Sequence, residues 1–288
     1  MKILMWFVSK DTAYLKKSLD ILDRQYNGVE FVGMATGEEI VQANRVGGGY
    51  DILLVVGAKQ IGMSGVTKIA RQLELPDEKL LGDYIVCIPG FTLEKYRKLQ
   101  RSRLSVFSRQ CFGGCISNLL GLPFRSPFVN LWLNEKEFLR FLHAPKVYLE
   151  EEPHFEKLNE PSKEAPDGYP VLSLGNILLN MSHYRDKDEA LAKWLERKTR
   201  INWYNLIAIT FTEREENLRE FDAMPFGKKV CFVPFKSNLD SAWYINPEID
   251  KGAKNLEDIV NRFGFGHFVY YDPFDMLLYG KKTPLIEM

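Results

Sequence analysis

Short, nearly continuous apolar runs recur along this chain and are separated by amphipathic segments. The clearest runs are Tyr50–Gly57 (YDILLVVG), Leu206–Phe211 (LIAITF) and Lys229–Pro234 (KVCFVP). A strand that is apolar on both faces is typical of a parallel sheet with helices on both sides. The pattern therefore predicts an α/β architecture in which right-handed β-α-β units build the sheets.

The first hundred residues alternate predicted strands and helices and suggest a Rossmann-like parallel sheet. The strands are expected at Lys2–Val8, Val29–Met34, Tyr50–Gly57 and Tyr84–Pro89, and the helices at Asp11–Leu22 and Ser64–Leu73. The first strand-to-helix turn, Val8–Asp11, contains no glycine, whereas the dinucleotide fingerprint requires glycines there. We expect a domain spanning 1–100 that does not bind NAD or FAD in the usual manner.

The rest of the chain, 101–288, predicts a second α/β domain. Its central stretch, Leu104–Pro123 (LSVFSRQCFGGCISNLLGLP), suggests a strand, a turn built on Gly113 and Gly114, and a helix. Further strands are expected at Ser126–Leu133, Val171–Ser182, Leu206–Phe211 and Lys229–Pro234, with a helix as the alternative at Val171–Ser182. Helices are expected from Asn134 and at Asp186–Lys198, Arg214–Phe221, Asn255–Phe263 and Phe274–Tyr279. Residues Glu150–Pro170, rich in acidic residues and proline, predict a mobile exposed loop.

The charge balance argues against a nucleic-acid partner. Lys plus Arg is 38 and Asp plus Glu is 38, so the formal net charge is zero and no overall basic field exists. Lys95–Arg103 (KYRKLQRSR) carries five basic residues and allows a basic patch. The end of a helix that begins near Thr92 explains these cations more simply, since cations gather at helix C-termini.

The same sequence predicts a cytoplasmic protein without a membrane span. Apolar runs fall short of the roughly 18 residues that a span needs. The first residues, Met1–Leu15, suit a buried strand better than a secretory signal. Four cysteines without the spacing of a disulfide framework suit a reducing compartment. The sequence identifies no cofactor.

The central stretch supplies one group of candidate site residues. Backbone N–H groups of a Gly113-Gly114 turn could hold an anion or a carbonyl oxygen at the sheet edge. Cys111 and Cys115 flank these glycines, and a thiol at a helix start can become a nucleophile, although free cysteines more often only pack. Cys87 and Cys231 lie in apolar runs, so we expect no metal site.

A second group lies within Asn180–Asn205. His183 follows a predicted strand and precedes a helix, where an imidazole can act as a general base. Arg197 and Arg200 could hold a phosphate or carboxylate, and Asn202 and Trp203 follow them, with the indole suited to a sugar or base ring. The alternative is that all of these residues are structural.

Two long motifs carry a resemblance to a known family. The runs SRQCFGGCISNLLGLPFRSPFVNLW and SHYRDKDEALAKWLERKTRINWYNL resemble a bacterial family of uncharacterised proteins, some of them labelled as exopolysaccharide-biosynthesis proteins. The chain departs from the family pattern at Gln110, where relatives tend to have asparagine. The resemblance implies a role in surface-polysaccharide assembly, with no established reaction to carry over.

Two functions follow from these observations. The first is an enzyme, with a transferase of sugar or nucleotide-sugar substrates as its expected form, in which His183 and Cys111 are the catalytic candidates. Its ligand would be a sugar phosphate or nucleotide-sugar held by the Gly113-Gly114 turn, Arg197, Arg200, Asn202 and Trp203. The second is a non-catalytic binding or assembly protein in which the motif residues are structural. The sequence does not decide the oligomeric state.

Overall fold

The computed structural model describes residues 1–46, 49–161 and 166–287. The chain divides into two compact units, Met1–Arg101 with Ser117–Pro123, and Ser102–Ile116 with Phe124–Met288. Helices and parallel strands occur in both units, so the predicted α/β class is confirmed. The division into domains 1–100 and 101–288 stays a prediction. Each unit is described separately.

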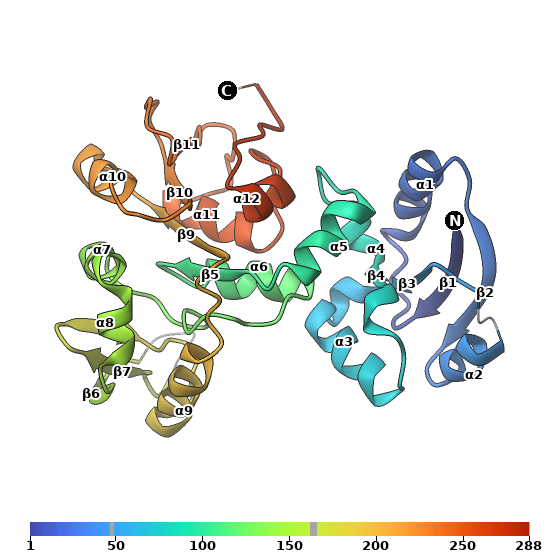
Figure 1. Cartoon of the computed structure of the whole chain (residues 1–288), viewed down its shortest axis with the longest axis horizontal. Helices are drawn as coiled ribbons and strands as arrows, with labels where there is room; N and C mark the ends of the chain where they lie inside the picture. The colour runs from blue at the N-terminus through green and yellow to red at the C-terminus, as the bar shows by residue number, and fades with distance from the viewer. Residues whose placement is uncertain (47–48, 162–165, 288) are drawn as a thin grey trace. The chain divides into compact units, whose positions relative to one another are not determined.

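The sheet of the first unit has the strand order β2-β1-β3-β4, and every neighbouring pair is parallel (Figure 1). The strands are β1 (Lys2–Phe7), β2 (Glu30–Thr36), β3 (Ile52–Val56) and β4 (Leu80–Gly82), and the first helices are α1 (Leu15–Tyr26), α2 (Glu39–Val46) and α3 (Met63–Gln72). All five residues of β3 are buried, as its continuous apolar run predicts.

The predicted strand at Tyr84–Pro89 is wrong, because the chain forms a short helix there. Strand β4 precedes it, and α4 (Asp83–Val86) follows at once. The buried carboxylate of Asp83 accepts hydrogen bonds from the N–H groups of Gly57 at 3.1 Å and Tyr84 at 2.9 Å. These bonds fix the turn after β4. A short apolar run is compatible with a buried strand or a buried helix, and only these contacts decide.

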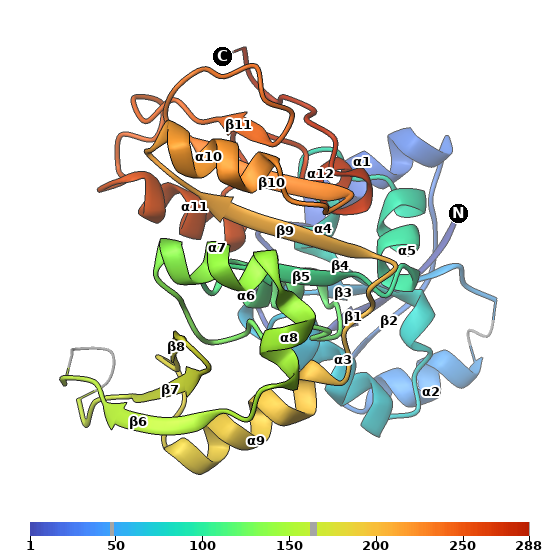
Figure 2. The ribbon, with the colours of Figure 1, turned by 60° about the vertical axis from the view of Figure 1, so that its left-hand side comes forward.

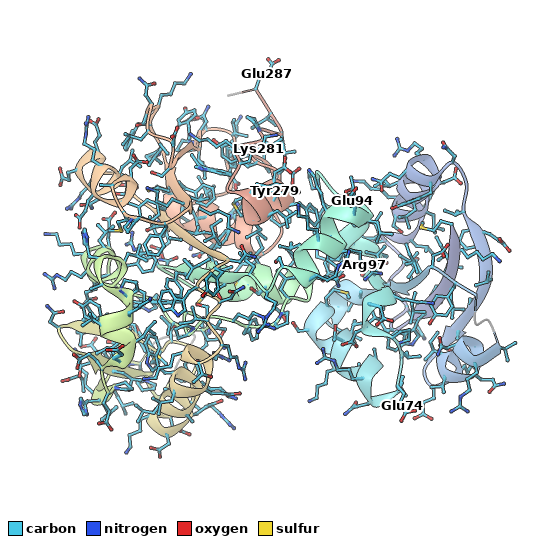
Figure 3. The ribbon with its side chains drawn as sticks, in the orientation of Figure 1. Glu74, Glu94, Arg97, Tyr279, Lys281 and Glu287 are labelled. Carbon is cyan, nitrogen blue, oxygen red and sulfur yellow. The ribbon has the colours of Figure 1, made fainter. Side chains whose placement is uncertain are left out.

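The basic segment after residue 92 is the end of a helix. Helix α5 (Leu93–Arg101) carries Glu94 and Arg97 (Figure 3). The Arg97 guanidinium donates to the Leu80 carbonyl oxygen at 3.1 Å and to Gln100 Oε1 at 2.9 Å. This cation therefore ties α5 to β4, in agreement with the helical interpretation of the basic run.

The sheet of the second unit has the order β11-β10-β9-β5, again parallel throughout. Its strands are β5 (Ser105–Ser108), β9 (Leu206–Phe211), β10 (Lys228–Val233) and β11 (Ala242–Tyr244). The sequence analysis missed β11, which is only three residues long.

Helices cover both faces of this sheet (Figures 1 and 2). On one face, Phe107 of β5 belongs to a buried cluster with residues of α7 (Glu135–His143) and α10 (Glu215–Asp222). On the other face lie α6 (Phe112–Leu120), α11 (Leu256–Gly264) and α12 (Pro273–Tyr279). There the rings of Phe112 and Phe263 stack at 6.0 Å, and Phe232 lies 6.2 Å from Phe112.

A smaller antiparallel sheet completes the second unit. It has the order β6-β7-β8, with β6 (His154–Leu158), β7 (Pro170–Leu174) and β8 (Ile177–Asn180), and the helices α8 (Pro145–Glu150) and α9 (Lys187–Lys198) belong to the same unit. Strand β6 lies inside the segment predicted to be a loop at 150–170, so that prediction is wrong there. Residues 162–165 of this segment lie outside the described residues.

The strand predicted at Ser126–Leu133 is also wrong. Asn130 adopts a left-handed conformation with φ 63°, which interrupts any extended run. One isolated bridge remains, in which Trp132 and Asn180 each donate a backbone N–H to the other's carbonyl oxygen at 3.0 Å.

Lys228 generates a prediction about stability and pH. Its ammonium donates to Asn205 Oδ1 at 2.6 Å and to the Leu277 carbonyl oxygen at 3.0 Å, and burial lowers the pKa of Lys228 to about 8. The unfolded chain keeps this proton to a higher pH, so unfolding takes up a proton above about pH 8. The Lys228 contribution to the free energy of unfolding should therefore rise with pH from about 8 to about 10.5.

Urea unfolding of the wild type and Lys228→Met at pH 7.5 and pH 10 measures this contribution. The stability of the wild type relative to the variant should be greater at pH 10 than at pH 7.5. A difference that is equal at both pH values, or smaller at pH 10, would show that the fold does not lower the pKa of Lys228.

Candidate functional site

The carboxyl end of β5 borders a pocket of about 860 Å3, here called the carboxyl-edge pocket. In open parallel sheets this edge is where ligands bind, because the loops that follow the strands meet there. The pocket is lined by Arg109, Gln110, Cys111, Trp132, Asn134, Tyr169, Ser182, His183, Lys254, Glu257, Asn261 and Phe265.

Local hydrogen bonds bring these segments together. Arg109, Gln110 and Cys111 directly follow β5 and lead into α6. The reciprocal bridge between Trp132 and Asn180 holds the segment after α6 against the end of β8. The residues that follow β8, including Ser182 and His183, thereby reach the pocket, and the His183 N–H donates to the Asn130 carbonyl oxygen at 3.4 Å.

Two helices complete the wall. Asn134 is the N-cap of α7, where it forms the capping box with Glu137 that the sequence predicts. Asn255 is the N-cap of α11 and accepts from the Asp258 N–H at 2.9 Å. Capping fixes where each helix begins, and so places Asn134 and Glu257 at the pocket.

The structure brings both predicted catalytic residues, Cys111 and His183, to this pocket. The Cys111 thiol donates to the Leu131 carbonyl oxygen at 3.8 Å. Burial raises the pKa of Cys111, and a hydrogen bond with Ser182 only partly opposes it. Burial also raises the pKa of Cys115, to about 12. Both thiols are therefore protonated at neutral pH, unlike an activated nucleophile. His183 is exposed.

Gly113 and Gly114 do not form the predicted turn, because α6 already begins at Phe112. The Gly113 N–H donates to Ser108 Oγ at 3.0 Å, so it is not open to a ligand. A Cβ on Gly113 would lie 2.9 Å from Ser108 Oγ, and one on Gly114 would lie 3.0 Å from Val129 Cγ1. These glycines allow α6 to pack closely on β5 and on the segment that follows α6.

Arg197 is buried, with 8% of its surface exposed. Its guanidinium donates to the Tyr184 hydroxyl at 2.5 Å and to the Val129 carbonyl oxygen at 3.3 Å. The Tyr184 hydroxyl donates to the same carbonyl oxygen at 2.7 Å. Arg197 therefore ties α9 to the segments that carry the pocket.

Arg200, Asn202 and Trp203 lie away from the carboxyl edge. Arg200 forms an ion pair with Glu196. The Asn202 N–H donates to Oγ of Ser105, the first residue of β5, at 2.9 Å. Asn202 and its neighbour Trp203 are thus at the amino end of the strand whose carboxyl end borders the pocket. Within the described residues, the pocket lining includes none of the predicted ligand-binding positions Gly113, Gly114, Arg197, Arg200, Asn202 and Trp203.

A separate cavity of about 330 Å3 contains Trp203 instead. The indole is 40% exposed and lies below the Lys146 ammonium, 5.4 Å from the ring centre. The same indole makes an edge-to-face contact with Phe107, with the ring centres 5.9 Å apart. Trp203 therefore serves both the core and the surface of the second unit.

Sequence reasoning missed Arg109 and Gln110. The Arg109 guanidinium donates to the Phe211 carbonyl oxygen at 3.1 Å and lies 4.3 Å from the centre of the Phe211 ring. Burial lowers the pKa of Arg109, while the nearby Glu135 carboxylate opposes the shift. Gln110 is only 9% exposed. In the sequence, the feature that could have identified these two residues is their position directly after a buried strand.

The described residues contain neither a metal-binding group nor a membrane-spanning helix. Among them, no group of three or more His, Cys, Asp or Glu side chains could hold a metal ion. No helix formed by them is long and apolar enough to cross a bilayer.

Comparisons with known proteins place most of the chain, including every residue of the pocket, in a sequence family. Residues 86–279 match the family described as "Domain of unknown function (DUF1919)". An uncharacterized protein of Haemophilus influenzae is 34% identical to this chain over 188 residues, which cover 62% of this chain and 84% of the relative.

Arg197 and Arg200 provide a matched pair for a stability test. Arg197→Met should lower the free energy of unfolding by about 1–3 kcal/mol, because it removes buried hydrogen bonds. Arg200→Met should lower it by no more than about 1 kcal/mol, because its ion pair is solvent-exposed. Urea denaturation measures both. Equal losses in the two variants would contradict the structural role of Arg197.

The thiols generate a second prediction. At pH 7, Cys111 should react with iodoacetamide more slowly than an exposed model thiol, because burial keeps it protonated. Its rate should rise with pH beyond 9, the ordinary pKa of a thiol. Mass spectrometry after timed alkylation gives the rate for each cysteine. Rapid alkylation of Cys111 at pH 7 would instead identify an activated thiolate.

Proposed function

The chain belongs to the DUF1919 family of domains of unknown function, and from that premise we propose that its second unit is an enzyme acting on a sugar or nucleotide-sugar. We place this activity in the assembly of exopolysaccharide or another surface polysaccharide, with a transferase reaction as its form. The family itself carries no assigned reaction, so the support comes from the pocket and from the motif resemblance.

The single observation that carries the proposal is the composition of the carboxyl-edge pocket. Its aromatic side chains are Trp132, Tyr169 and Phe265, and its amide and hydroxyl groups come from Gln110, Asn134, Ser182 and Asn261. Flat rings pack against the C–H faces of a sugar, while amides and hydroxyls exchange hydrogen bonds with its hydroxyl groups. At about 860 Å3, the pocket lies within the usual range for small-ligand sites.

His183 is the candidate for proton transfer. It lines the pocket and is exposed, so a bound substrate can reach its ring. An imidazole can accept or donate a proton near neutral pH. In a transferase, a hydroxyl oxygen of the acceptor would form the new bond to the anomeric carbon and lose its proton to His183. The leaving group would depart with the electron pair of the broken bond.

Cys111 lines the same pocket, but its thiol is not activated. Burial raises the pKa of its thiol, which disfavours the thiolate that covalent catalysis needs. Cys111 therefore remains a candidate for contact with substrate, and the proposal assigns it no covalent step.

The cytoplasmic location is part of the same proposal. All four cysteines are free thiols, which suits a reducing compartment.

A binding or assembly protein without catalysis is the second candidate. Its support is that several motif residues are used within the fold. Arg197 bonds Tyr184, and Asn205 donates to the Ser102 carbonyl oxygen at 2.7 Å. This candidate requires a ligand or partner that binds without turnover.

Replacing His183 distinguishes the two candidates. A thermal-shift screen against nucleotide-sugars, sugar phosphates and free sugars first identifies a stabilising ligand. Turnover of that ligand with a sugar acceptor should then fall by about 10²–10⁴-fold in His183→Ala, the usual contribution of a general acid or base. The melting temperature should stay close to the wild-type value, since His183 is exposed.

His143→Ala is the matched control. His143 is also half exposed, is 2.8 Å from Glu220 through Nε2, and is not among the residues that line the pocket. It should keep wild-type turnover. Equal turnover in wild type and His183→Ala would exclude the catalytic role, and binding without turnover in the wild type would favour the second candidate.

A further inference from the structure

The carboxyl-edge pocket is positively charged. Its described lining includes the cations Arg109 and Lys254 and one carboxylate, Glu257, so these groups sum to one positive charge with His183 neutral. Lys254 is exposed.

Arg109 retains unused hydrogen-bonding capacity. A guanidinium has five N–H donors, and the Phe211 carbonyl oxygen accepts from one nitrogen of Arg109 at 3.1 Å. Its Nε is buried and has no hydrogen-bond partner among the described residues. The Glu135 carboxylate is 4.0 Å away, too far for a hydrogen bond. A partly desolvated cation in this state gains when an anion supplies the missing acceptors.

Three helices begin at the pocket and add to its field. Cys111 directly precedes α6, Asn134 caps α7, and Glu257 is in the first turn of α11. A helix N-terminus carries a partial positive charge and favours an anion nearby. Here the helices strengthen the effect of Arg109 and Lys254.

Gln110 adds a requirement for a hydrogen-bond donor. Its side chain is nine-tenths buried, and within the described part of the chain Oε1 has no hydrogen-bond partner. A buried acceptor left without a donor costs free energy. A sugar hydroxyl in the pocket can supply that donor.

The neighbouring pocket of about 250 Å3 has the opposite charge. It shares Arg109 and Glu257 with the carboxyl-edge pocket and adds Glu135, Glu213 and Arg214. Three carboxylates against two guanidiniums sum to one negative charge. An anion therefore favours the carboxyl-edge side of Arg109.

We propose that the carboxyl-edge pocket selects phosphorylated sugars, either sugar phosphates or nucleotide-sugars. The phosphate oxygens bind Arg109 and Lys254, and Gln110 accepts a hydrogen bond from a sugar hydroxyl. The inference rests on the proposed function and names the substrate class and the groups that recognise it. It replaces the phosphate-binding role that the sequence suggests for Arg197 and Arg200, which bond Tyr184 and Glu196.

Calorimetric titration of the full chain with glucose 1-phosphate and methyl α-glucoside tests the proposal, since the phosphate separates the two probes. Glucose 1-phosphate should bind at least tenfold more tightly. Arg109→Gln and Lys254→Gln should each weaken its binding about tenfold, the effect of losing one charge-assisted hydrogen bond of about 1.5 kcal/mol. Neither change should alter binding of the glucoside by more than about twofold.

Lys254→Gln and one further variant, Arg200→Gln, sharpen the test. Lys254→Gln alters an exposed side chain, so it remains informative if Arg109→Gln unfolds after losing its contacts with Phe211. Arg200→Gln removes one guanidinium outside the pocket and should leave both affinities unchanged. Raising the NaCl concentration should weaken the binding of the phosphate ester and not the binding of the glucoside.

The outcomes separate this inference from the proposed function. Equal affinities for the two probes would overturn the inference and leave a sugar-binding enzyme in place. Tight binding of glucose 1-phosphate that neither Lys254→Gln nor a folded Arg109→Gln weakens would place the phosphate elsewhere, which also overturns it. Failure of both probes to bind would overturn the inference, whereas the proposed function would fail only if wild-type turnover were absent or His183→Ala left turnover unchanged.

Discussion

The second unit depends on the hydrogen bonds that meet at the Val129 carbonyl oxygen. This oxygen accepts hydrogen bonds from the Tyr184 hydroxyl and from the buried Arg197 guanidinium. Three segments far apart in sequence thereby meet at one buried atom. A few residues on, Trp132 and Asn180 exchange backbone hydrogen bonds. The two contacts hold in place the segment between α6 and α7, which is neither helix nor strand. Such a segment needs these partners because buried backbone groups cannot remain unpaired.

Many polar motif residues lie outside the pocket because they hold the chain in position. The side-chain amides of Asn202 and Asn205 donate to backbone carbonyl oxygens just before β5, and Gly113 and Gly114 let α6 approach closely. Such residues set the position of the strand whose carboxyl end carries Arg109 and Gln110. Residues that position β5 therefore lie at its amino end, and residues that line the pocket lie at its carboxyl end. The sequence motif contains both kinds of residue and does not distinguish them.

Much of the fold was predictable from local physics. Strands β9 and β10 are continuous apolar runs, and α7, α9 and α11 begin at capping residues that the sequence shows directly. The errors came where local signals allow two structures. Tyr84–Val86 is apolar enough for a strand but forms a helix after the buried Asp83, and Ser126–Leu133 lacks a partner strand along its length. The hydrogen bond from the Gly57 N–H to the Asp83 carboxylate decided the first case, and the left-handed conformation of Asn130 decided the second.

The sequence by itself determined the α/β class, most helix starts, and two residues that line the carboxyl-edge pocket. His183 and Cys111 were identifiable because each adjoins a predicted strand or turn, where parallel sheets collect functional groups. Only the tertiary structure decided which charges reach the pocket. Arg197 and Arg109 are the same residue type, yet one is bonded to Tyr184 in the interior and the other lines the cavity with donors unused. Their difference arises from contacts with residues far away in sequence, and no local pattern contains that information.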